Sequence, residues 1–106
     1  MADEKKEFTM VKHIVCFKLK DNSRAACEQA RDILLSMRGK VEQLRGLAVG
    51  VDFLHSERSY DLILEATLDD PAALEAYQNH PYHVETVKPY MHAVRSASVA
   101  VDYVVE

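Results

Sequence analysis

Apolar and polar positions alternate along the first part of the chain, from residue 9 to residue 20. One face of this stretch carries Val11, His13, Val15, Phe17 and Leu19. A period of two predicts a β-strand. The centre of the opposite face is also apolar, which favours a strand that is covered on both sides. We expect the face that carries His13 to form the interior of a barrel.

Two further stretches repeat with helical spacing. After the candidate caps at residues 21–23, apolar side chains recur every three or four positions, which predicts an amphipathic helix that stops near Gly39, with a short turn reaching about residue 43. Asp70 and Pro71 then mark the start of a second helix over residues 71–79. His80 precedes Pro81 and is therefore disfavoured in helical conformation. A further helix should begin at Pro81, and Pro89 should interrupt or restart it.

Three more strands are predicted by alternating or β-rich patterns. Residues 47–54 and 60–68 are separated by the polar residues 55–59, which favours an antiparallel hairpin. Residues 96–105 form the last strand, in which Val99, Val101, Tyr103 and Val105 alternate with a second set of side chains. The predicted order is β-α-β-β-α-β, the ferredoxin-like α+β arrangement with a four-stranded antiparallel sheet.

The length and composition of the chain agree with one small domain, which would bury more apolar surface as a homodimer. A chain of 106 residues buries only a modest core, so two sheets packed face to face as a homodimeric α/β barrel would cover the second apolar face. We interpret residues 1–8 as a charged, flexible N-terminal extension and residues 9–106 as the domain. A formal net charge of -4 without a basic block argues against nucleic-acid binding.

The two cysteines and the hydropathy pattern indicate the cellular compartment of the protein. Cys16 and Cys27 lie in the interiors of predicted elements and do not make a disulfide framework. No apolar run approaches the roughly 20 residues that span a bilayer, so we expect no membrane partner. The sequence therefore favours a cytoplasmic protein.

Candidate proton-transfer groups are concentrated in residues 77–83, Tyr-Gln-Asn-His-Pro-Tyr-His. A neutral imidazole titrates near neutrality and can take and return a proton. Tyr77 and His83 are six positions apart across a predicted helix break, so helical spacing does not place them together. His80 and His83 offer two nitrogens, but no neighbouring third ligand completes a zinc site, and we predict neither a metal nor a cofactor.

Three stretches together resemble the stress-responsive A/B barrel (Dabb) family: residues 11–18, residues 60–64 and residues 77–83. The Tyr-x-x-His-Pro-x-His run is the most specific of them, and the likeness extends from about residue 9 to residue 103. The resemblance implies a ferredoxin-like domain that dimerises into a barrel. Most members have no assigned reaction. One branch, typified by olivetolic acid cyclase, closes a linear polyketide by aldol condensation without a metal.

Residue roles follow from this resemblance and not from spacing. His83 matches the position of the catalytic base, and Tyr77 matches the tyrosine that helps to hold the substrate. His13 matches a pocket-lining position, and Leu62 stands where the cyclase carries a histidine. The ligand-binding set expected on this basis is His13, Val15, Phe17, Leu62 and Leu64.

Structural roles are the alternatives for the same residues. His83 would cap or pack against the first turn of its helix. His13 would be a core histidine whose ring is hydrogen-bonded within the protein, and Tyr77 would be a core residue whose hydroxyl finds a partner. His80 is interpreted as stabilising the junction. The first functional hypothesis is a Dabb-domain homodimer with a partly apolar pocket in each subunit for a small apolar or aromatic ligand, without an assigned activity. The alternative is a cofactor-independent lyase or cyclase that acts on a small carbonyl or polyketide-like compound, with His83 as general base.

Overall fold

The computed structural model describes residues 10–106, so the extension predicted for residues 1–8 lies outside the described residues. Its elements are β1 (Val11–Leu19), α2 (Arg24–Leu35), β2 (Gly46–Val51), β3 (Leu62–Leu68), α3 (Pro71–Gln78), the π-helical segment η1 (His83–Val87), α4 (Lys88–Val94) and β4 (Arg95–Val104). No helix in this part of the chain is long and apolar enough to cross a bilayer.

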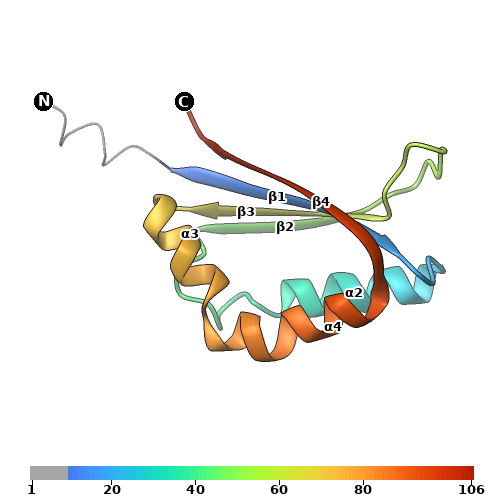
Figure 1. Cartoon of the computed structure of the whole chain (residues 1–106), viewed down its shortest axis with the longest axis horizontal. Helices are drawn as coiled ribbons and strands as arrows, with labels where there is room; N and C mark the ends of the chain where they lie inside the picture. Colours follow the sequence, from blue (N-terminus) through green and yellow to red (C-terminus); the bar gives the residue numbers. More distant parts are fainter. Residues whose placement is uncertain (1–9) are drawn as a thin grey trace, which may run out of the picture.

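The four strands form one antiparallel sheet in the order β2-β3-β1-β4. All of the helices lie on the same side of the sheet, and β4 runs along its edge after returning from α4 (Figure 1). The predicted hairpin is confirmed, because β2 and β3 pair directly, from Gly46 opposite Thr67 to Val51 opposite Leu62. The predicted ferredoxin-like α+β fold is confirmed as well.

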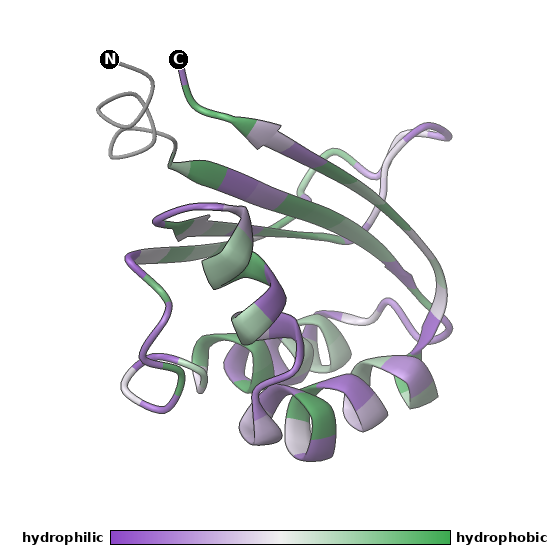
Figure 2. Cartoon of the chain, turned by 60° about the vertical axis from the view of Figure 1, so that its left-hand side comes forward, coloured by the Kyte–Doolittle hydropathy of each residue, from purple (hydrophilic) through white to green (hydrophobic). Residues whose placement is uncertain are grey.

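The helix-covered face of the sheet holds the core. His13 lies on this face, with buried residues from β1, α2, β3, α3, η1 and α4, namely Val11, Phe17, Leu34, Leu64, Ala66, Leu68, Tyr77, Val87 and Met91. The helices leave the other face of the sheet uncovered (Figure 2). By the strand register this face carries Val99, Val101 and Tyr103, which are 50%, 61% and 47% exposed. The expectation that the face of His13 forms a barrel interior is therefore wrong, because the helices of its own subunit cover it.

The second strand is shorter than its pattern predicts. It ends at Val51 rather than at residue 54, and β3 begins at Leu62 rather than at residue 60. The Asp52 carboxylate accepts a hydrogen bond from the backbone N–H of His55 at 2.7 Å, and His55 takes a positive φ of 55°. This turn directs the chain away from the sheet and leaves Phe53 87% exposed.

Two helices also differ from their predicted limits. The helix α2 ends at Leu35, and its apolar pattern continues through turns in which Met37 and Val41 are still buried. Gly39 adopts a φ of 77°, the left-handed conformation expected where a helix must stop. The predicted interruption at Pro89 takes the form of a π-helical segment. The N–H of Lys88 reaches back five residues to the carbonyl of His83, and α4 continues through Pro89.

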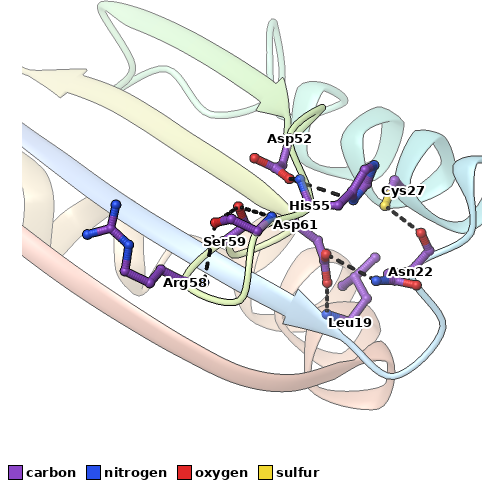
Figure 3. Close-up of polar contacts among 9 residues, drawn as sticks. Leu19, Asn22, Cys27, Asp52, His55, Arg58, Ser59 and Asp61 are labelled. Carbon is purple, nitrogen blue, oxygen red and sulfur yellow. Dashed lines mark hydrogen bonds and ion pairs between the residues drawn. The ribbon is translucent and has the colours of Figure 1, made fainter.

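A buried carboxylate fixes the end of β1 that leads into α2. Asp61, 9% exposed, accepts a hydrogen bond from the backbone N–H of Leu19 at 2.8 Å and a longer one from the Asn22 amide at 3.5 Å (Figure 3). Its own N–H donates to the carbonyl of Phe17 at 2.8 Å. These bonds pair the N–H of Leu19 and the carbonyl of Phe17 at the end of the β1–β3 strand pairing. Leaving such a buried backbone group unpaired would cost about 1–3 kcal/mol.

Candidate functional site

A cavity of about 320 Å³ lies between the helix-covered face of the sheet and the helical segments η1 and α4. Its walls combine apolar and polar side chains, and the polar ones come from β1, α3, η1, α4 and β4. The lining residues are His13, Val15, Phe17, Leu34, Leu64, Tyr77, Gln78, His83, Val87, Lys88, Met91, His92, Arg95 and Ser98.

Three aromatic rings meet at one end of this cavity. The ring centroids of Tyr77 and His83 are 5.0 Å apart, and those of His13 and Tyr77 are 5.6 Å apart in an edge-on arrangement. Tyr77 comes from the last turn of α3, and His83 is the first residue of η1. The junction at Pro81 therefore folds back far enough to place side chains together that helical spacing alone would not.

The backbone fixes the tautomer of His83. Its Nδ1 lies 3.1 Å from the carbonyl oxygen of Gln78. A carbonyl only accepts, so Nδ1 carries the hydrogen and Nε2 keeps its lone pair in the neutral ring. Burial lowers the pKa of His83 below its ordinary value of 6.5, partly opposed by the hydrogen bond to Gln78, with the Lys88 ammonium adding to the decrease. At neutral pH His83 is therefore a neutral base.

The phenol of Tyr77 stays protonated. Its side chain is 1% exposed, and this burial, together with the charge of Asp102, raises the pKa of Tyr77 to about 12. Among residues 10–106 its hydroxyl forms no hydrogen bond, and the residue lines the cavity. The hydroxyl is available as a donor to a molecule in the cavity.

A carboxylate on the edge strand holds His13. Asp102 faces His13 directly across the β1–β4 ladder, and Asp102 Oδ1 is hydrogen-bonded to His13 Nδ1. The side chain of Asp102 is 43% exposed, whereas that of His13 is 10% exposed. Because a carboxylate only accepts, Nδ1 of His13 is the donor, so its ring is held in one orientation at the wall of the cavity.

His80 has a different environment. Its Nδ1 accepts a hydrogen bond from the N–H of Tyr82 at 3.0 Å, and its Nε2 donates to the Glu42 carboxylate at 2.9 Å. This geometry ties the helix junction to the turn after α2. His80 does not line the cavity, and its ring and that of His83 engage different partners.

Six of the seven residues expected from the sequence line the cavity. Leu62 does not. It is 2% exposed and lies in the core opposite Phe17 on β1 and Val51 on β2. Sequence reasoning missed Lys88, His92 and Arg95, although their spacing of four and three places them on one face of the predicted helix. Asp102 was missed because its partnership with His13 depends on the strand register.

A second hollow, of about 400 Å³, lies between α2 and the β2–β3 loop. Its walls include Arg24, Glu28, Arg31 and Phe53. Arg24 pairs with Glu28 at 3.2 Å and Arg31 with Asp32 at 3.2 Å, so the charges there are already matched. The buried, converging polar groups are those of the first cavity, which is therefore the candidate site.

The lowered pKa of His83 leads to a pH prediction. In an NMR titration of the folded protein, the His83 ring should titrate below pH 6.5, whereas in urea it should titrate near 6.5. Between these midpoints the unfolded chain binds more protons, so the stability contribution of His83 is present above 6.5 and lost as pH falls through the folded pKa. The variant His83→Gln should lack this component. A folded midpoint at or above 6.5 would contradict the assignment of a desolvated ring.

Comparisons with known proteins agree with the fold. The family model of the stress responsive A/B barrel domain (Dabb) matches residues 11–105. A dimeric ferredoxin-like protein of unknown function from Bacteroides fragilis is 25% identical, with a TM-score of 0.78 over 91% of this chain and 96% of that one. Another, from Thermobifida fusca, is 26% identical, with a TM-score of 0.78 over 92% of each chain.

A hydroxynitrile lyase from Passiflora edulis shares the fold alone, at 17% identity and a TM-score of 0.78 over 93% of this chain and 95% of that one. No curated protein gave a significant match. The family model covers nearly all of the described residues, and the solved structures share their β-α-β-β-α-β architecture. The chain therefore belongs to the stress responsive A/B barrel domain (Dabb) family.

Proposed function

We propose that this Dabb protein is a homodimer that binds a small, partly apolar molecule in the cavity of each subunit. The observation that carries the proposal is the cavity of about 320 Å³, in which three converging polar rings lie beside apolar side chains from the sheet and the helices. Such a combination of apolar lining and a few placed polar groups is typical of small-molecule sites. We further propose a cytoplasmic location, in keeping with the unpaired Cys16 and Cys27.

The uncovered face of the sheet supports the dimer. Val99, Val101 and Tyr103 project from β4 on this face, beside the partly buried Ile14 and Ile63. A contiguous apolar surface of this kind is unfavourable in water and is typical of an interface. The B. fragilis and T. fusca structures are both described as dimeric.

A charge on this face should separate the subunits. The variant Val101→Asp should shift the mass measured by light scattering at about 10 μM from two chains to one, because an unpaired carboxylate buried between the sheets is costly. The control is Leu54→Asp, at an exposed position of the β2–β3 loop, which should stay dimeric. A parent protein with the mass of one chain would overturn the proposal.

The shape and lining of the cavity suit a ligand with a hydrocarbon body and one carbonyl or phenol group. Val15, Phe17, Leu64 and Met91 supply apolar contact. At the polar end, the hydroxyl of Tyr77 is free to donate and Nε2 of His83 is free to accept. The hydroxyl of Tyr77 would donate to a carbonyl or phenol oxygen of the ligand, and Nε2 of His83 would accept a hydrogen bond from a phenol O–H.

A larger side chain that fills part of the cavity should weaken ligand binding. We expect 4-butylacetophenone to bind the parent protein in a calorimetric titration and to shift the NMR signals of the His83 ring. The variant Val15→Phe should weaken this binding at least about tenfold, because its ring occupies the ligand volume. The matched control Val84→Phe, at an exposed position of η1, should bind as the parent does, with the melting temperature of each variant recorded. Equal binding by both variants would place the ligand elsewhere.

A second candidate function is a cofactor-independent lyase or cyclase activity. The observation that favours it is the pairing of a neutral His83, oriented by Gln78, with a protonated Tyr77. Nε2 of His83 would take a proton from the carbon next to a carbonyl, and the C–H electron pair would move onto the carbonyl oxygen. The hydroxyl of Tyr77 would donate to the enolate oxygen as its charge develops. The enolate would then attack a second carbonyl or expel a leaving group.

Proton abstraction can be followed without knowing the natural substrate. In D₂O, the parent protein should catalyse deuterium incorporation next to the carbonyl of 4-phenylbutan-2-one, with a rate that rises with pH through the His83 pKa and then levels off. The variants His83→Gln and Tyr77→Phe should each lower this rate about 10²-fold. The control His55→Gln, in the exposed β2–β3 loop, should keep it. Unchanged exchange in His83→Gln would eliminate the mechanism.

A further inference from the structure

Basic side chains line the part of the cavity formed by α4 and the start of β4. Lys88 and His92 are four residues apart and lie on one side of α4, and Arg95 is the first residue of β4. Ser98, three residues further along β4 and opposite Phe17 of β1, also lines the cavity.

Within residues 10–106, neither Lys88 nor Arg95 forms an ion pair, although Arg24, Arg31 and Arg45 each pair with a carboxylate. Arg95 is also partly buried, which makes an anionic partner for its guanidinium favourable.

The balance of charge around the cavity points the same way. Within the described part of the chain, no aspartate or glutamate lines the cavity, whereas the whole chain has a net charge of -4. The neighbouring carboxylate of Asp102 is already bound to His13. The local positive potential is therefore a property of this cavity and is opposite in sign to the chain as a whole.

We propose that the ligand of this cavity is an organic acid, whose anionic group is bound by Arg95 and Lys88 while the rest of the molecule extends toward Tyr77 and His83. This inference rests on the proposed ligand-binding function and adds the class of ligand. A guanidinium suits a carboxylate or phosphate because its N–H groups donate to two oxygens at once. The hydrocarbon part contacts Phe17, Leu64 and Met91.

The test compares ligands that differ only in charge. Dissociation constants are measured by calorimetry at pH 7.5 for 4-butylbenzoate, 4-butylphenyl phosphate and the neutral 4-butylbenzamide. The proteins are the parent, Arg95→Gln, Lys88→Gln and the control Arg58→Gln, which changes an arginine of the exposed β2–β3 loop. Circular dichroism establishes that each variant is folded.

We expect the parent to bind at least one of the two anions about tenfold or more tightly than the amide, the usual worth of one charge-assisted hydrogen bond. Whichever anion binds more tightly distinguishes carboxylate from phosphate recognition. Arg95→Gln and Lys88→Gln should each remove much of that preference without weakening amide binding, and Arg58→Gln should retain it. Equal binding of anions and amide by the parent would overturn the acid preference and leave the binding cavity in place. Absence of binding by all three probes would overturn both proposals.

Discussion

The paired ladders of β1 are the constraint on which the rest of the structure depends. This strand is hydrogen-bonded to β3 on one side and to β4 on the other over most of its length. Side chains alternate between faces, so a slip of one residue would exchange the two faces completely. The observed register sets His13 under the helices, beside Tyr77 and opposite Asp102, and leaves Ile14 and Cys16 on the uncovered face.

The helical layer positions the remaining groups through two prolines. Pro81 separates α3 from the next helical segment, so Tyr77 and His83 approach from different directions. The π-helical segment then precedes Pro89 and lets the helix continue through a residue that lacks an N–H. This arrangement leaves Lys88 and His92 of α4 on the cavity wall, next to Arg95 at the start of β4. Which side chains line the cavity therefore depends on the backbone geometry at these two prolines as well as on the residue types.

The sequence predicted the fold well because periodicity reports directly on which side chains are buried. It misplaced element ends where a side chain competes with the backbone, as Asp52 does at the end of β2. The pairing of Tyr77 with His83 came from family resemblance, since no spacing rule crosses a proline junction. Asp102 and the face of His13 depended on strand register and on which side the helices cover, and both are tertiary properties. Leu62 shares the face of Leu64 but lies deeper in the core, a difference that alternation does not reveal.

The direct junction between α4 and β4 has a mechanical consequence. Val94 ends the helix and Arg95 begins the strand, and the carbonyl of Val94 also accepts a hydrogen bond from Lys20 at 2.9 Å. No loop is present there to absorb movement. A displacement of α4 by a bound molecule would therefore strain the start of β4, whose outward side chains form the uncovered face.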